Sequence, residues 1–217
     1  MPDDEVDPTG RSSGSPIGGD GPALEDAVAA LEAGSIVAIP TDTVYGLAVD
    51  PRRPGATDLL FALKLRPATL ELPVLVADVA QADALAGPAG LPPPARRLVD
   101  RFWPGPLTIV VARRTGLDWH LGGDGRTIGL RCPAHPVVQR LCRRVGPLAT
   151  TSANRHGQPP ATTVAELTRE FGDALGVVVD GGVCDAAPST VVDATGGTPR
   201  CIRDGPLPWS EIEAASR

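Results

Sequence analysis

Short apolar runs that end in polar residues recur along the chain and predict the buried strands of a sheet. The first run spans residues 36–39 and breaks at Pro40 into a turn that carries Thr41, Asp42 and Thr43. Three later stretches have the same form. Because ligands bind where strands end in open α/β sheets, we expect these polar ends to meet at one rim of the sheet.

Helical periodicity alternates with these runs. Helices are predicted from residue 22, around 59–63, at 79–86, 94–102 and 136–145, after the capping-box pattern at 163–166, and from residue 210. Further strands are predicted at 73–77, 107–111, 127–130, 147–151, 177–180, 191–192 and 201–203. Several strands follow one another without a helix between them. The predicted fold class is therefore α/β or α+β, a mixed sheet with helices packed on it.

The chain divides into three parts by composition. Residues 1–21 are rich in Asp, Gly, Ser and Pro with few apolar residues, which predicts a disordered tail. Residues 22–208 carry most of the periodic segments and are expected to form one domain, followed by a short helix or tail over residues 209–217. A length of 217 residues and a hydrophobic content of 42% suit one sizeable core.

Charge and composition exclude several classes of protein. A net charge of -6 argues against a basic surface over the whole molecule, and an aromatic content of 3% argues against base-stacking platforms for nucleic acid. The four cysteines include no CxxC pair, so a zinc site is not expected. The sequence has no signal peptide and no apolar run of membrane-spanning length, which favours a cytoplasmic protein with reduced thiols and no membrane partner.

Two cations lie where the second predicted helix must stop. Lys64 and Arg66 are one residue apart, and Pro67 disfavours helix at the residue before it. Lysine supplies a compact charge and arginine a planar fork, so the pair could clamp an anion. A solvated basic surface at a helix C-terminus explains the same residues, and the sequence leaves both interpretations open.

Polar groups at other strand ends allow a similar pair of interpretations. Arg131 follows an apolar strand, where it either binds a ligand or forms an internal ion pair. Ser152 and Asn154 close another strand and can bind phosphate or ribose oxygens, although ordinary turns use the same residues. Ser189 and Thr190 share that ambiguity. The sequence indicates no Walker loop and no catalytic or metal-ligand spacing of histidines.

Taken in order, these motifs resemble the YrdC-like threonylcarbamoyl-AMP synthases. The resemblance covers roughly residues 22–208, and the chain looks like the short form of the family, without the extra C-terminal domain of longer relatives. Leu65 stands where the family commonly has glycine, and Leu72 where it commonly has a polar residue. The matching stretches are IPTDTVYGLAVD (39–50), KLRP (64–67), WPGPLTIVV (103–111), TIGLRCPAHP (127–136), TSANRHGQPPATT (151–163), and PSTVVD (188–193) with IRDG (202–205).

The resemblance implies an enzyme, a nucleotidyltransferase that makes L-threonylcarbamoyl-AMP from L-threonine, bicarbonate and ATP and releases pyrophosphate. Mg²⁺ would accompany the ATP. The product would feed the threonylcarbamoyladenosine modification of tRNAs that read ANN codons, through a downstream tRNA threonylcarbamoyl transferase complex. The resemblance further implies a YrdC-like fold, a twisted mixed sheet with a large concave site, and contact with tRNA or double-stranded RNA.

The same resemblance assigns roles by motif position. Lys64 and Arg66 would be the catalytic pair. The side of the site that binds threonine would consist of Thr41, Thr43, Arg131 and Ser189. The side that binds ATP would consist of Lys64, Arg66, Thr127, Ser152, Asn154, Thr162 and Arg203. No protein ligand to a metal is implied.

Two other functions stay open at this point. One is an RNA-binding module of the same fold that performs no adenylation, although the negative charge and the few aromatic residues argue against it. The other is an enzyme that forms a carbamoyl-adenylate and acts on a different acceptor. Whether pyrophosphate release requires L-threonine distinguishes these functions from one another.

Overall fold

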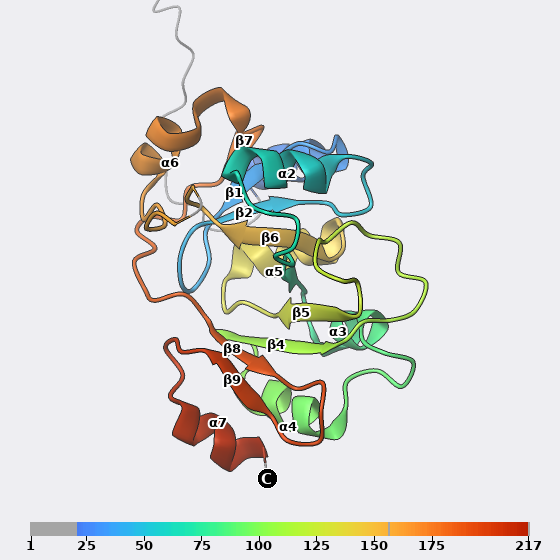
Figure 1. Ribbon diagram of the computed structural model, residues 1–217. Helices are drawn as coiled ribbons and strands as arrows, with labels where there is room; N and C mark the ends of the chain where they lie inside the picture. Colours follow the sequence, from blue (N-terminus) through green and yellow to red (C-terminus); the bar gives the residue numbers. More distant parts are fainter. Residues whose placement is uncertain (1–20, 156, 217) are drawn as a thin grey trace, which may run out of the picture.

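One mixed sheet organises the described part of the chain. The computed structural model describes residues 21–155 and 157–216. Its strands are β1 (Val37–Ile39), β2 (Gly46–Val49), β3 (Val74–Leu75), β4 (Leu107–Ala112), β5 (Thr127–Arg131), β6 (Leu148–Ser152), β7 (Val177–Val178), β8 (Thr190–Asp193) and β9 (Arg200–Arg203). They lie side by side in the order β7-β1-β2-β6-β3-β5-β4-β8-β9 (Figure 1).

Both strand directions occur within this sheet. The parallel pairs are β1 with β7, β3 with β5, and β4 with β8. The antiparallel pairs are β1 with β2, β2 with β6, β3 with β6, β4 with β5, and β8 with β9. The predicted mixed sheet flanked by helices is thereby confirmed.

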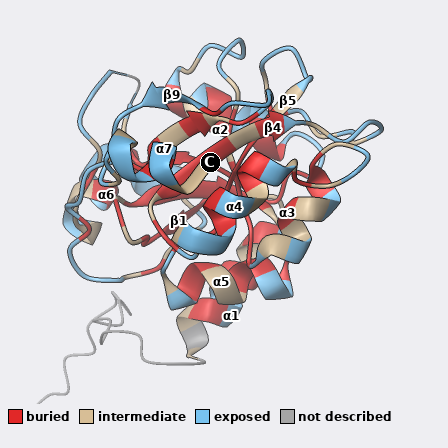
Figure 2. Cartoon of the chain, turned by 90° about the horizontal axis from the view of Figure 1, so that it is seen from below, coloured by how far each residue is buried: buried red, intermediate tan, exposed pale blue. Residues whose placement is uncertain are grey.

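Helices pack around the sheet. They are α1 (Pro22–Glu32), α2 (Ala56–Lys64), α3 (Val79–Leu85), α4 (Pro93–Phe102), α5 (Pro136–Arg144), α6 (Val164–Phe171) and α7 (Trp209–Ser216), with a 3₁₀ turn η1 at Gly172–Ala174. Helices α1 and α5 contact each other, as do α4 and α7 near the C-terminus (Figures 1 and 2). In Figure 2 the buried side of these helices faces the strands. Among the described helices, none has the length and apolar character needed to cross a membrane.

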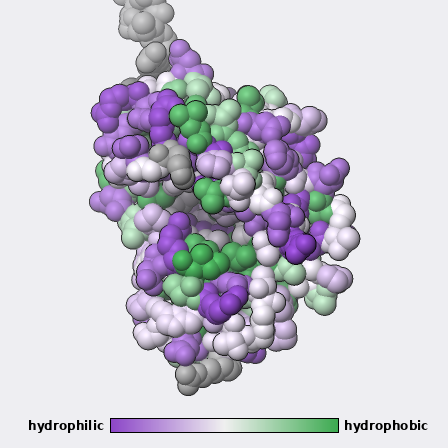
Figure 3. All heavy atoms as spheres, viewed as in Figure 1, coloured by the Kyte–Doolittle hydropathy of each residue, from purple (hydrophilic) through white to green (hydrophobic). Residues whose placement is uncertain are grey.

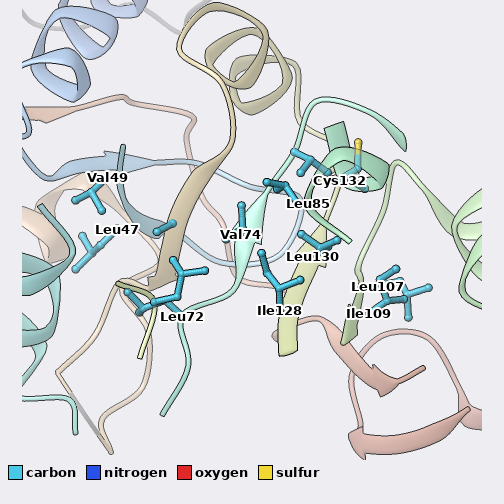
Figure 4. Close-up of a cluster of buried hydrophobic side chains, with 14 of the residues drawn as sticks. Leu47, Val49, Leu72, Val74, Leu85, Leu107, Ile109, Ile128, Leu130 and Cys132 are labelled. Atoms are coloured by element: carbon cyan, nitrogen blue, oxygen red, sulfur yellow. The ribbon is translucent and has the colours of Figure 1, made fainter. Parts of the chain in front are cut away.

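The hydrophobic core consists of two clusters, and single strands contribute to both. Leu47 and Val49 belong to the larger cluster, whereas Ala48 between them packs with α1 and α5 in the smaller one. Side chains alternate along a strand, so neighbouring residues face opposite sides of the sheet. Figure 4 shows how the larger cluster runs along successive strands, from Val74 to Ile128 and Leu107.

Most predicted elements are present, but β2 was not predicted. The sequence analysis predicts only a turn after Pro40, whereas residues Gly46–Val49 form a strand whose four residues are all buried. A strand that is buried throughout shows no alternation of apolar and polar residues, so its signal is weak. The predicted tail falls outside the described residues except for Gly21, and the division of the chain into three parts stays a prediction.

Leu65 adopts a backbone conformation that usually belongs to glycine. It caps α2 with φ of 52° and ψ of 36°, and no other non-glycine residue in the described ranges has a positive φ. Its N–H donates to the carbonyl of Ala62, and its side chain is 73% exposed. Glycine adopts this left-handed conformation without the steric conflict of a Cβ. The position that departs from the resembled family is therefore strained.

We expect Leu65→Gly to stabilise the protein by roughly 0.5–1 kcal/mol, because the relieved strain exceeds the extra flexibility of glycine in the unfolded chain. Urea unfolding measures the change. Leu59→Gly is the matched control, because Leu59 is also exposed but lies inside α2, where glycine should cost about 1 kcal/mol. A Leu65→Gly protein that unfolds at lower urea than the unchanged protein would contradict the assignment of strain.

Candidate active site

A cavity of about 150 Å³ lies among residues from distant parts of the chain. Figure 3 shows this side of the molecule hollowed near its middle, with hydrophilic and hydrophobic side chains on the rim. Seven of the eleven predicted site residues line the cavity: Thr41, Thr43, Arg66, Arg131, Ser152, Ser189 and Arg203. The other lining residues are Val44, Tyr45, Gly46, Pro73, Leu75, Thr108, Thr150, Thr151 and Pro188.

Polar residues from the strand ends line one cavity, as expected from the sequence, but the ends do not lie at one edge of the sheet. Strand β3 runs parallel to β5 but antiparallel to β6, so Arg131 and Ser152 end strands that point in opposite directions. The cavity therefore extends along the strands as well as past their ends. Leu75, Thr108 and Thr150 line it from within β3, β4 and β6.

Lys64, in the last turn of α2, is buried. Its side chain is 2% exposed, which excludes the solvated basic surface that the sequence left open. The Nζ atom donates to the carbonyl of Ser152 at 2.6 Å and to Oδ1 of Asn154 at 2.9 Å. Lys64 is also the one lysine among the 20 Lys and Arg residues of the chain. Burial, and secondarily the charge of Arg66, lowers the pKa of Lys64 to about 8.

Arg66 is held by the loop that follows it. Its Nε donates to the carbonyl of Leu70 at 3.2 Å and its Nη2 to the carbonyl of Glu71 at 3.0 Å. Both acceptors are neutral, and burial lowers the pKa of the Arg66 guanidinium. The loop therefore fixes the position of this cation without neutralising it.

Arg131, at the end of β5, forms the internal ion pair that the sequence left open and also borders the cavity. Its Nη2 forms an ion pair with Oδ1 of Asp42 at 2.7 Å, and its side chain also lines the cavity. Its Nη1 donates to Oγ1 of Thr43 at 2.9 Å, and its Nε to the carbonyl of Gly105 at 3.2 Å. Burial lowers the pKa of Arg131 and the charge of Asp42 opposes that shift.

Arg203 brings a third guanidinium to the cavity from strand β9. It donates through Nε and Nη2 to the carbonyl of Ser189, at 3.2 and 2.7 Å, and through Nη2 to Oγ of Ser189 at 3.2 Å. Oγ of Ser189 in turn lies 2.8 Å from Oγ1 of Thr108. Burial lowers the pKa of Arg203, as it does for the other two arginines.

The lining of the cavity is cationic. Among the described residues it includes Arg66, Arg131 and Arg203 and no carboxylate, and the one ion pair that these arginines form there is the contact between Arg131 and Asp42. A partly enclosed surface of one sign attracts ligands of the opposite sign. The arrangement is suited to an anion, with hydroxyl groups of threonine and serine to orient it.

The remaining predicted residues do not line this cavity. Thr127 donates to Oε2 of Glu71 at 3.0 Å, and Thr162 donates to Oε2 of Glu166 at 3.1 Å. Asn154 lines a separate cavity beside α6, and it accepts a hydrogen bond from Lys64. The amide of Asn154 also donates to two carbonyls of its own loop, as in an ordinary turn.

Sequence reasoning missed several lining residues. Thr108 is a buried hydroxyl in the otherwise apolar strand β4, and Thr150 is a buried hydroxyl in β6. A polar residue in a buried strand was an available signal, because such a group needs a partner. Leu72, by contrast, is fully buried in the larger core cluster and lies outside the cavity lining.

Within the described ranges, no group of three or more His, Cys, Asp or Glu residues is arranged to hold a metal ion. The lining of the cavity has arginines where a magnesium site would have carboxylates. These residues therefore do not fit a metal held by the protein itself.

Comparisons with known proteins agree on one family. A model of the Sua5/YciO/YrdC family, which has the description telomere recombination, matches residues 29–205. A Mycobacterium tuberculosis protein, provisionally named threonylcarbamoyl-AMP synthase, is 39% identical over 210 residues, which are 96% of this chain and 92% of that protein. The threonylcarbamoyl-AMP synthase of Yersinia enterocolitica is 35% identical over 178 residues, 81% of this chain and 93% of its own length.

Solved structures show the same similarity. The crystal structure of Sua5 from Pyrococcus abyssi, complexed with L-threonine, matches with a TM-score of 0.83 at 34% identity. The match covers 88% of this chain and 56% of Sua5, so the chain spans little more than half of that protein. YciO from Escherichia coli has a TM-score of 0.79 at 22% identity and supports the fold alone.

The buried state of Lys64 predicts an unusual titration. In a sample labelled with nitrogen-15 at lysine only, the single side-chain signal should titrate near pH 8 in the folded protein and near pH 10.5 after unfolding. The folded state then binds fewer protons than the unfolded state between these values, so this group favours folding increasingly as pH rises through that window.

The variant Arg66→Gln should raise the midpoint only in part, because burial is the larger cause of the shift. Arg53→Gln is the control, because Arg53 pairs with Asp50 away from the cavity. A midpoint near 10.5 in the folded protein would contradict the burial of Lys64.

Proposed function

Because the chain belongs to the Sua5/YciO/YrdC family, we propose that it is an enzyme that makes L-threonylcarbamoyl-AMP from L-threonine, bicarbonate and ATP and releases pyrophosphate. The observation that carries this proposal is the cationic cavity, which seven residues of the predicted site line together. The names of the relatives and the L-threonine in the complex of Sua5 support the same reaction.

The size of the cavity supports a division of the site. Pockets that enclose drug-sized ligands have volumes of roughly 300–1,000 Å³. A cavity of about 150 Å³ is smaller and suits the amino acid rather than the nucleotide. All four residues assigned to the threonine side line it: Thr41, Thr43, Arg131 and Ser189. ATP would lie over the mouth of the cavity, with its α-phosphate toward the amino acid.

The cations of the cavity fit the chemistry of this reaction. The amine of L-threonine would combine with carbon dioxide and lose a proton, or with bicarbonate and lose water. An oxygen of the resulting carbamate would attack the α-phosphorus as pyrophosphate leaves. Two anions must approach each other in that step. Positioned cations lower the barrier without a covalent protein intermediate, which agrees with a site that has no evident nucleophile. Arg66 and Arg203 would serve the phosphates, and Lys64 would act from behind Ser152.

The rest of the ATP side stays a prediction. Lys64, Arg66, Ser152 and Arg203 are in the cavity wall or directly behind it, which supports their assignment. Thr127 and Thr162 donate to carboxylates, so a role in binding ATP requires them to exchange those partners. Asn154 would act by holding Lys64 in place.

Other parts of the proposal follow from the reaction. Mg²⁺ would arrive as the complex with ATP and leave with pyrophosphate, since the described residues offer no ligand set of their own. The product would pass to a tRNA threonylcarbamoyl transferase complex. Contact with tRNA or double-stranded RNA and a cytoplasmic location are further predictions of the same function.

The test is release of pyrophosphate from ATP and bicarbonate, with and without L-threonine. We expect release only when all three reactants are present. Lys64→Ala and Arg66→Ala should each lower the rate about a hundredfold or more, as removal of a group that stabilises transition-state charge does.

Arg53→Ala is the control, because its exposed guanidinium lies outside the cavity, and it should keep near-normal rates. Normal rates in both variants at positions 64 and 66 would reject their catalytic role. Release without L-threonine would reject the proposed acceptor.

A further inference from the structure

Asp42 lies behind the cavity and keeps one carboxylate oxygen without a partner. Its Oδ1 accepts from Nη2 of Arg131 at 2.7 Å, and the two side chains are only 15% and 8% exposed. Its Oδ2 is buried and has no hydrogen-bond partner among the described residues. A half-satisfied buried carboxylate is costly, and Asp42 does not line the cavity itself. Its contribution to the site must therefore pass through Arg131.

Arg131 fixes one end of a chain of hydrogen bonds. Its Nη1 lies 2.9 Å from Oγ1 of Thr43. A guanidinium has donors and no acceptor, so the oxygen of Thr43 accepts in this contact. Asp42 and the carbonyl of Gly105 hold the guanidinium plane on its other sides.

Val44 fixes the other end of the chain. Its carbonyl lies 2.6 Å from Oγ1 of Thr41, and a carbonyl only accepts, so the hydroxyl proton of Thr41 is used there. The backbone N–H of Thr43 also donates to Oγ1 of Thr41, at 3.1 Å. In the 3.0 Å contact between the two hydroxyls, Thr43 must therefore be the donor. Each group donates a hydrogen bond to the next, from Arg131 to Thr43, from Thr43 to Thr41 and from Thr41 to the carbonyl of Val44.

This direction determines what Thr43 can offer a ligand. Its proton is given to Thr41 and one lone pair accepts from Arg131, which leaves one lone pair. Toward the cavity, Thr43 can then only accept, so the ligand must bring a donor. Arg131 uses three of its five N–H groups in the contacts described, and the other two remain for an anion. A carboxylate and an amine side by side, as in an α-amino acid, complement this pair of groups.

We propose that Asp42 is a positioning residue that holds Arg131 and thereby orders the hydroxyl chain, so that Thr43 reads an N–H group of the bound amino acid. This inference rests on the proposed function and names how its amino-acid substrate is recognised. The carbamate formed from that amine keeps one N–H, so the contact persists through the reaction.

The test compares two probes by calorimetric titration of the full chain: L-threonine and 3-hydroxybutyrate, which lacks the amino group. We expect the unchanged protein to bind L-threonine at least about tenfold more tightly, because 3-hydroxybutyrate leaves the acceptor of Thr43 unpaired. Thr43→Val should remove that preference, with little change in the binding of 3-hydroxybutyrate. Asp42→Asn, which keeps the shape of the side chain but removes its charge, should also reduce the preference about tenfold.

Asp50→Asn is the matched control. Asp50 is buried and paired with Arg52 and Arg53, but it lies outside the cavity lining. Asp50→Asn should lose thermal stability and keep the preference for the amine. If the role of Asp42 were merely structural, Asp42→Asn would show the same two results. Melting temperatures of all variants establish that each is folded before titration.

Each result decides the inference. An equal loss of affinity for both probes in Thr43→Val would mean that Thr43 donates to the carboxylate, and it would overturn the proposed direction. An unchanged preference in a folded Asp42→Asn protein would overturn the positioning role while leaving the proposed function intact. Failure of the unchanged protein to bind L-threonine at all would overturn both.

Discussion

The site depends on cationic side chains that are partly or fully buried and have few negative charges around them. Lys64 is almost fully buried, and its Nζ donates to a carbonyl and to an amide oxygen. Arg66 and Arg203 are likewise held by neutral oxygens. An incompletely compensated cation is unfavourable in the unliganded protein, and an anionic ligand supplies what is missing. The folded chain therefore favours the binding of an anion at this site, and the packing of the chain determines where the site lies.

The secondary-structure elements that carry the cationic side chains help to hold them in place. Lys64 is the last residue of α2 and Arg131 ends β5, and both elements pack in the core, whereas Arg203 ends β9, whose residues are all exposed. Groups held on core elements need little rearrangement when charge develops between bound reactants, which is what electrostatic catalysis requires. Arg66 differs, because loop carbonyls rather than a regular element fix its guanidinium.

The strained position of Leu65 belongs to the same design. The turn that ends α2 after Lys64 and leads to Arg66 requires a left-handed residue between the two cations. The chain makes that turn with leucine, and the geometry is retained because neighbouring backbone bonds to Phe61 and Ala62 hold it. The spacing between Lys64 and Arg66 is therefore kept although the turn between them costs local stability.

The sequence by itself determined the class of fold, most of the helices and strands, and the set of polar residues worth examining. Apolar periodicity and the turn residues are local, and so are helix stops such as Pro67. It also marked Arg131 as a charge that needs a partner, because a cation after a buried strand has few alternatives. Strand β2 escaped prediction because it is buried on both faces and begins with glycine.

Only the tertiary structure decided which of those residues share a cavity. Thr127, Asn154 and Thr162 have the same kinds of side chain as residues that line it, yet each has partners elsewhere. Asp42 belongs to a turn in the sequence, and only the fold brings its carboxylate to Arg131, which lies 89 positions away in the chain. Strand pairing and direction set such distances, and they depend on contacts between segments far apart in sequence. Local patterns identify the chemical groups, whereas the packing of the whole chain decides their partners.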